Sequence, residues 1–234
     1  SIVKRFNGAY KEPVPDPTPG GSTCTISTPS QVDTTWVNEF LGRTNDNHAA
    51  DSSMNILYLA GSRRYAYVRF TIAPGATCDE GGTLPTGADI KSARLRLYTY
   101  NIGGLPACGA NSCWHVAERV RGSWNVNTLT WNNQPCPTGY GQSCEPGDAA
   151  SPILFEHGTG ALDWSARYQY VEQTRLLSDV RSFYSGSLTN YGWVIKEACA
   201  ITYGKACGDI SPGFQMRSRY GAVSERPALE LVYV

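Results

Sequence analysis

The sequence has no excess of charge of either sign, because 20 basic residues are balanced by 20 acidic ones. A neutral chain has no overall field to attract nucleic acid or an anionic membrane surface. No apolar run approaches the roughly 18 residues that a membrane-spanning helix needs. The composition therefore predicts no nucleic-acid partner and no membrane span, although it leaves room for a local basic patch.

Histidine is also scarce. The three histidines, His48, His115 and His157, stand singly in the sequence, and no G-x-S-x-G segment is present to hold a serine nucleophile on a sharp turn. Loop carboxylates are plentiful, but no spacing pairs two of them across a cleft, as glycoside cleavage requires. We therefore predict a protein that is not an enzyme.

The cysteines and histidines lack the spacing of a metal site. No Cys-x-x-Cys segment occurs and no two histidines stand at ligand spacing, which disfavours zinc. Calcium is an alternative, because Asp46 with Asp51, and Asp79 with Glu80, stand in polar loops where oxygen ligands can converge. No EF-hand-like order of ligands accompanies them. We predict solvated turn residues there, no metal and no cofactor.

Eight cysteines are present, and their placement predicts disulfides rather than free thiols. An even count indicates an oxidising compartment. Three pairs each bracket a short Gly-containing polar stretch, and Cys24 and Cys78 remain as the fourth. The chain starts at Ser1 without an apolar leader, as expected of a mature secreted protein, and we predict an extracellular or cell-surface location. The expected pairs are Cys24–Cys78, Cys108–Cys113, Cys136–Cys144 and Cys199–Cys207.

Glycine, proline and tyrosine are abundant, at 24, 14 and 14 residues, whereas only 17% of the residues are charged. This composition favours many short strands joined by turns. Apolar residues recur at every second position in residues 65–72 and 93–99, the period at which side chains share one face of a sheet. One helix is predicted over residues 171–184 from its apolar i, i+4, i+7 spacing. We predict an all-β, antiparallel, jelly-roll-like β-sandwich over residues 31–234, with one short helix and disulfide-stapled loops.

Five short segments stand in an order that is typical of one kind of domain. They are residues 67–70 (YVRF), 90–97 (IKSARLRL), 130–135 (TWNNQP), 190–193 (NYGW) and 226–233 (RPALELVY). In this order they resemble the DNRLRE family of secreted β-sandwich domains, and the resemblance covers nearly the whole chain. The resemblance implies a β-sandwich fold and an extracellular setting. It does not by itself imply an activity, but it favours a carbohydrate-binding module, because some relatives bind acidic polysaccharides such as alginate through basic residues.

Two of the predicted strands carry tyrosine and arginine opposite their apolar residues. If these strands pair, one sheet face presents aromatic rings that suit the C–H faces of sugars and guanidinium groups that suit carboxylates. The alternative is a solvated face of cross-strand Tyr–Arg pairs that stabilises the sheet and binds nothing. The predicted glycan-binding residues are Tyr65, Tyr67, Arg69, Arg94, Arg96, Tyr98 and Tyr100.

Residues 1–30 are predicted to form an extended arm. Proline at every second position from 13 to 19 excludes a helix there. Before these prolines, Ile2, Val3, Phe6 and Tyr10 belong to a segment with the composition of one strand. This strand has three possible roles: it adds to a neighbouring copy, it folds back on its own sandwich, or it is part of a linker.

Two functions therefore compete. In the first, the chain is a non-catalytic extracellular subunit that donates its N-terminal strand to the next copy of itself. Head-to-tail contacts of this kind do not close into a ring, so the copies assemble into a filament or surface layer. In the second, it is a carbohydrate-binding module for an acidic polysaccharide. The single domain and the Pro-rich arm favour the first, which is the main prediction, and the family resemblance favours the second.

Overall fold

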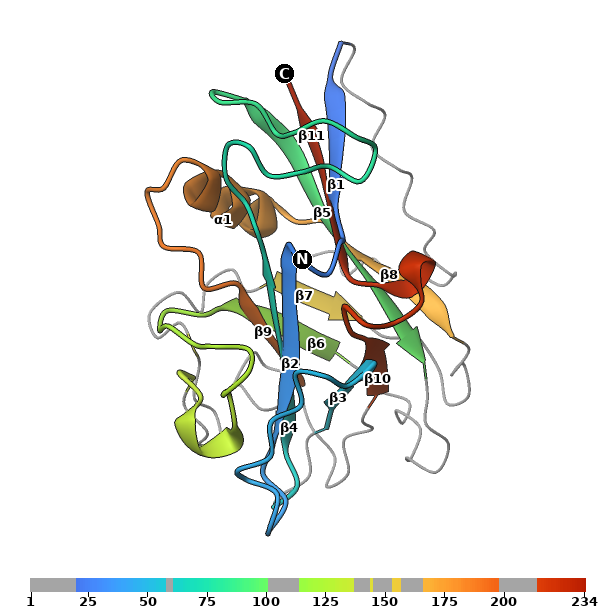
Figure 1. Ribbon diagram of the computed structural model, residues 1–234, viewed down its shortest axis with the longest axis vertical. Coiled ribbons are helices and arrows are strands. Elements are labelled where there is room, and N and C mark those ends of the chain that lie inside the picture. The colour runs from blue at the N-terminus through green and yellow to red at the C-terminus, as the bar shows by residue number, and fades with distance from the viewer. Residues whose placement is uncertain are drawn as a thin grey trace, which may run out of the picture.

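The computed structural model describes residues 20–57, 61–100, 114–136, 144, 153–156, 166–197 and 214–234. Within these residues the chain forms two antiparallel β-sheets (Figure 1). Apolar side chains from both sheets meet in one buried core between them. The all-β sandwich predicted from the sequence is confirmed.

Sheet A contains six of the described strands. In order they are β1 (Ser22–Ile26), β11 (Ala228–Tyr233), β5 (Ile90–Tyr100), β10 (Phe214–Arg217) and β3 (Ser53–Ile56), with β8 (Arg167–Val171) also paired to β5. β8 occupies one edge of β5, along residues that also pair with β11 and with β10. β11 and β10 therefore lie end to end along the other edge of β5. Every strand of this sheet therefore lies at most two strands from β5.

Sheet B contains five described strands and packs on the inner face of sheet A. In order they are β2 (Val32–Asn38), β4 (Arg64–Phe70), β9 (Trp193–Glu197), β6 (Trp114–Arg119) and β7 (Ile153–Glu156). The alternation in β4 sends Ala66, Val68 and Phe70 into the core, where they join Leu95 and Leu97 of β5. Alternate residues of β4 and β5 therefore point outward on opposite sides of the molecule.

Helix α1 (Thr174–Tyr184) links the two sheets at one side of the core (Figure 1). Its apolar face packs into the core as the i, i+4, i+7 spacing predicts. On the helix, Asp179 accepts a hydrogen bond from the indole Nε1 of Trp193 at 3.1 Å and pairs with Arg119 at 3.0 Å, which ties α1 to sheet B. The helix begins three residues later than predicted, because Val171 is the last residue of β8 and a short connection precedes Thr174.

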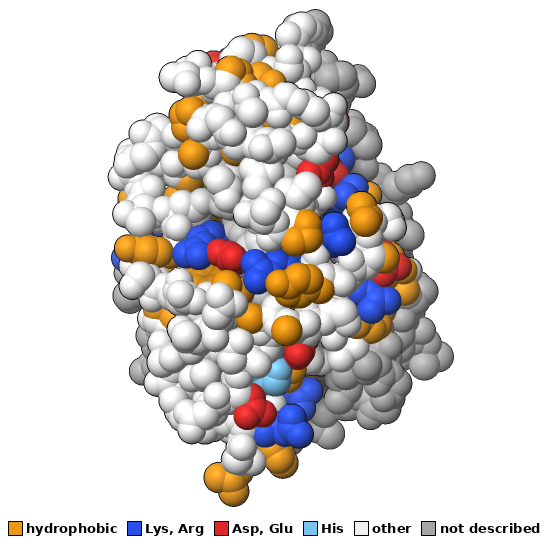
Figure 2. All heavy atoms as spheres, in the orientation of Figure 1, with side chains coloured by type: hydrophobic (Ala, Val, Ile, Leu, Met, Phe, Trp, Pro, Cys, Tyr) orange, Lys and Arg blue, Asp and Glu red, His pale blue; other side chains and the backbone are white. Residues whose placement is uncertain are grey.

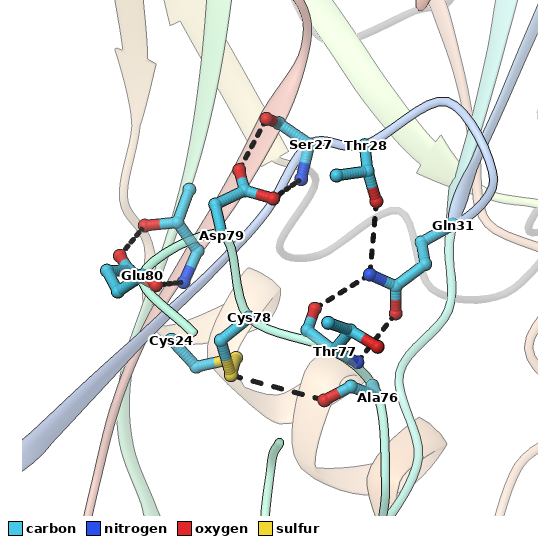
Figure 3. The surroundings of a disulfide bond; sticks show 10 residues. Cys24, Ser27, Thr28, Gln31, Ala76, Thr77, Cys78, Asp79 and Glu80 are labelled. Atoms are coloured by element: carbon cyan, nitrogen blue, oxygen red, sulfur yellow. Dashed lines mark hydrogen bonds between the residues drawn. A yellow bond between two sulfur atoms is a disulfide. The ribbon is translucent and has the colours of Figure 1, made fainter. Parts of the chain in front are cut away.

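Two of the predicted disulfides lie in the described residues and are present, namely Cys24–Cys78 and Cys136–Cys144. The other predicted pairs, Cys108–Cys113 and Cys199–Cys207, lie outside the described residues. The first disulfide joins β1 to the loop before β5 and is buried (Figure 3). It therefore fixes an edge strand of sheet A to the rest of the domain.

The outer edge of β1 is closed by the two acidic residues that follow Cys78 (Figure 3). Glu80 accepts a hydrogen bond from the backbone N–H of Thr25 at 2.9 Å, and the backbone N–H of Asp79 donates to the Thr25 carbonyl at 2.8 Å. Burial opposes ionisation of Glu80, but the hydrogen bonds from Thr25 outweigh it and lower its pKa. These contacts occupy backbone groups that an edge strand otherwise offers to another chain.

Candidate functional site

The predicted Tyr/Arg face is divided between the two sheets. β4 pairs with β2 and β9, whereas β5 pairs with β11, β8 and β10. The assumption that these two strands pair is therefore wrong. Each strand has one apolar and one polar face, and this pattern is the same for strands that are neighbours and for strands that face each other across a core.

The two tyrosines on the outer face of β4 are buried. Tyr65 and Tyr67 are 2% and 0% exposed, and they pack against Trp131 and Trp124 with ring centroids 5.2 and 5.5 Å apart. The hydroxyl of Tyr67 donates to Oε1 of Gln134 at 2.8 Å, and burial raises the pKa of Tyr67 well above its usual value. These tyrosines form a second core beneath the segment 120–136 and have no surface to offer a ligand.

Arg69 lies near them at the surface but is held in a network of charges. Its guanidinium pairs with Asp33 and lies 4.7 Å from the ring of Trp124. Asp33 also pairs with Arg219 at 2.9 Å, and Arg219 lies 5.0 Å from the ring of Tyr220. Figure 2 shows basic, acidic and hydrophobic side chains interleaved in a band across the middle of this face. The shared carboxylate indicates that the band stabilises the edge of sheet B.

A cavity of about 290 Å³ lies beside this band. Asp33, Arg69 and Asn190 are among the residues that line it. The amide of Asn190 donates to the Phe70 carbonyl at 2.7 Å and accepts from the N–H of Gly192 at 3.0 Å. Because its polar lining already has partners, the cavity presents few groups that could select a ligand.

The remaining predicted residues lie together on the outer face of sheet A. Arg94 donates from Nε to Glu230 at 2.7 Å, and Arg96 lies 3.2 Å from the same carboxylate. Tyr98 and Tyr100 follow on the same face of β5, and all four are partly exposed. Arg94 and Arg96 share this one carboxylate, so the two arginines carry one more charge than Glu230 balances.

Strand β8 adds two exposed tyrosines that sequence reasoning missed. Tyr168 and Tyr170 are 38% and 43% exposed, and the register places them beside Tyr98 and Arg96. Their ring centroids are 6.2 Å apart. We call these two rings the tyrosine platform. The alternation of tyrosine in residues 167–171 was the signal that could have identified them, because aromatic residues at every second position favour a strand.

The arginines of β5 pack against the platform. The guanidinium of Arg94 lies 4.8 Å from the ring of Tyr170, and that of Arg96 lies 5.6 Å from Tyr168. The hydroxyl of Tyr168 donates to the carbonyl of Ser224 at 3.0 Å, in the short helix η3 (Val223–Glu225). These contacts hold the rings and charges in fixed positions, which limits the entropy that a ligand must remove on binding.

The described residues thus form an antiparallel β-sandwich whose sheet A carries exposed tyrosine and partly exposed arginine side chains on its outer face. The model of carbohydrate-binding module family 96 matches residues 25–150, more than half of the chain. The chain belongs to this family, and the carbohydrate-binding alternative derived from the sequence gains its support from this match. Comparison with curated proteins gave no match.

The remaining predictions concern self-assembly, metal binding and membrane spans. The predicted assembly residues Ile2, Val3, Phe6 and Tyr10 lie outside the described residues, so self-assembly stays a prediction. In the described part of the chain, no three histidine, cysteine or acidic side chains gather closely enough to hold a metal ion. No described helix has the length and apolar character needed to cross a membrane.

Proposed function

We propose that this chain is a non-catalytic extracellular module that binds an acidic polysaccharide on the outer face of sheet A. The observation that carries the proposal is the tyrosine platform, with the guanidinium groups of Arg94 and Arg96 packed against its two exposed rings. Membership of a carbohydrate-binding family supports the ligand class. The disulfides support the compartment, because such bonds persist where the surroundings are oxidising.

The platform provides the contact with sugar rings. A tyrosine ring offers a flat apolar surface together with a polar hydroxyl, and its rigid side chain loses little entropy when it binds. Tyr168 and Tyr170 are two residues apart in one strand and therefore stand on the same face. Two neighbouring rings in fixed positions favour a chain of sugars over a single one.

The arginines provide the preference for acidic sugars. Arg94 and Arg96 together carry two positive charges against the single carboxylate of Glu230. A uronate carboxylate placed beside these groups would accept from a planar, permanently charged donor, which is the geometry that arginine recognises best.

Replacement of Tyr170 by alanine is expected to weaken polysaccharide binding at least tenfold, because truncation of a central aromatic contact removes about 1.4 kcal/mol or more. The double variant Arg94→Gln with Arg96→Gln should lose binding to alginate and polygalacturonate, since glutamine keeps a hydrogen bond to Glu230 but removes the charge. Affinity electrophoresis and titration calorimetry on a panel of acidic and neutral polysaccharides measure both effects.

Tyr220→Ala is the matched control, because Tyr220 is 49% exposed and contacts Arg219 rather than the platform. It should bind as the parent does, and its stability should change by no more than about 0.5 kcal/mol. Binding to acidic chains should also fall as salt rises, because surface charges are screened. A parent chain that binds no polysaccharide of the panel, or a Tyr170→Ala variant with full affinity, would contradict the proposal.

Self-assembly through the N-terminal arm is a separate prediction. Removal of residues 1–12 is expected to leave a folded monomer that forms no filaments, as judged by light scattering and electron microscopy. The backbone N–H and carbonyl of Thr25 on the outer edge of β1 are already bonded, so an incoming strand could not pair with β1 at that residue. Assembly of the truncated chain, or a parent chain that stays monomeric at high concentration, would show that the arm does not donate a strand.

A further inference from the structure

A further arginine–tyrosine pair lies on the outer face of sheet A, beyond the tyrosine platform. The guanidinium of Arg217 on β10 lies 4.3 Å from the ring of Tyr100 on β5, and its Nη1 donates to the Tyr100 hydroxyl at 3.3 Å. Both residues are partly exposed, and the side chain of Arg217 is 32% exposed. The contact is of the same kind as those that Arg94 and Arg96 make with the platform. The pair therefore offers a sugar chain the same chemical groups.

Tyr100 stands in one row with the residues that contact the platform. Alternate residues of a strand share a face, so Tyr100 is in line with Tyr98 and Arg96 on β5. The ring of Tyr98 lies 5.1 Å from that of Tyr168 in the platform. From Arg94 to Tyr100 the strand rises by about 20 Å, at roughly 3.4 Å per residue. A disaccharide is shorter than this row, so only a longer chain of sugars reaches both of its ends.

The short helix η3 joins the platform to this further pair. Its Ser224 carbonyl accepts from the hydroxyl of Tyr168, and its Glu225 accepts from Nε of Arg217 at 2.7 Å. Figure 1 shows η3 as the red turn beside β8. Val223, the first residue of η3, is apolar and 70% exposed. Ligand sites combine apolar lining with a few polar groups, and Val223 adds an apolar contact at the edge of the row.

The charges along the row favour an acidic ligand. Arg94 and Arg96 share the carboxylate of Glu230, and Arg217 pairs with Glu225, so three guanidinium groups face two carboxylates. The bonds of Arg217 to Glu225 and Tyr100 use Nε and Nη1. Among the residues that the structure describes, none accepts a hydrogen bond from its Nη2. A planar guanidinium with a remaining donor suits the carboxylate of an acidic sugar.

We propose that Tyr100 and Arg217 form a second subsite for the acidic polysaccharide, with Val223 at its edge. The bound chain runs along β5 from the platform to Tyr100. It places one uronate carboxylate near Arg94 and Arg96 and another near Arg217. This inference rests on the proposed function and adds to it that the ligand is a run of several consecutive acidic sugars, not a chain with one isolated acidic residue.

Titration calorimetry with di-, tetra- and octagalacturonate tests the second subsite. In the parent chain the affinity should rise with the length of the oligosaccharide, because only a longer chain reaches both subsites. Arg217→Gln keeps a hydrogen bond to Glu225 but removes the charge. It is expected to lower the affinity for octagalacturonate about tenfold, as the loss of one charge-assisted hydrogen bond does, and that for digalacturonate far less. Tyr170→Ala should instead weaken binding at every length, because it removes part of the platform.

A matched pair of variants at Val223 tests the position of the bound chain without removing any contact of Arg217. Because Val223 is exposed and uncharged, Val223→Asp should weaken the binding of octagalacturonate and Val223→Lys should strengthen it, through their charges beside an acidic chain. Arg43→Gln is the control, since Arg43 is an exposed cation in the loop after β2 that pairs with Asp46. It should bind every oligosaccharide as the parent does.

The outcomes separate this inference from the proposed function. A parent chain that binds none of the oligogalacturonates overturns both. Weaker binding in Tyr170→Ala, together with unchanged binding in Arg217→Gln and Val223→Asp, supports the platform and overturns the second subsite alone. An equal loss at every length in Arg217→Gln also overturns the second subsite, because it shows that Arg217 acts through the platform.

Discussion

Substitution of Lys196 by methionine is expected to destabilise the folded chain by about 3–5 kcal/mol, because it leaves a buried carboxylate without its cation. The side chains of Lys196 on β9 and Glu118 on β6 are each 1% exposed, and Nζ lies 2.7 Å from Oε2. The same oxygen accepts the backbone N–H of Cys144 at 3.1 Å, and Nζ lies 5.2 Å from the ring of Tyr65. This pair is therefore enclosed by the second core.

The double variant Lys196→Met with Glu118→Gln distinguishes the ion pair from simple packing. Burial lowers the pKa of Lys196, and Glu118 opposes this effect without overcoming it. Removal of both charges ends the desolvation cost, while the glutamine oxygen still accepts from Cys144. Urea unfolding should show that the double variant recovers most of the stability lost in Lys196→Met. A single variant that loses less than about 1 kcal/mol would show that the carboxylate finds water or another partner.

The elements of the sandwich that sequence predicted best are those with strong local periodicity. The alternation in β4 and β5 identified both strands and their core faces, and the apolar spacing in residues 171–184 identified α1. Local cysteine spacing also predicted the Cys136–Cys144 disulfide. In each case the signal lies within a few residues, and the physical cause is the fixed direction of side chains along a strand or helix.

The candidate site was harder to predict because it depends on which strands are neighbours. Tyr65 and Tyr67 have the same alternation as Tyr98 and Tyr100, yet the first two are buried under Trp124 and its loop. Alternation identifies the core face of a strand but does not report what covers its other face. Tyrosine is compatible with both positions, since it has an apolar ring and a polar hydroxyl.

The tyrosine platform was missed for a related reason. Residues 167–171 precede a strongly periodic helix, and the helix prediction extended into Val171 of β8. The short strand pairs with the middle of β5, more than 60 residues away in sequence, so its partner is not a local feature.

Substitution of Gly192 by alanine is expected to destabilise the chain by about 3 kcal/mol or more, through two separate effects. Gly192 has a φ of +72°, where an L side chain costs roughly 1–2 kcal/mol. An alanine Cβ there would lie 2.2 Å from the carbonyl oxygen of Val68 and 2.8 Å from Cα of Arg69. The backbone of β4 would have to move, and overpacking of this kind costs roughly a further 1–3 kcal/mol.

The close approach at Gly192 can be separated from its backbone conformation by a matched control. Gly186, which follows α1, has the same φ of +72°, but an added Cβ meets no atom within 4 Å. Gly186→Ala should therefore show the conformational cost alone, and the difference between the two variants measures the contact with β4. Because the Asn190–Gly192 turn also binds β4 through the Phe70 carbonyl, we expect urea unfolding to give a difference of about 2 kcal/mol. Equal losses in the two variants would show that the turn yields without moving the strand, and that its glycine is required only for the left-handed conformation.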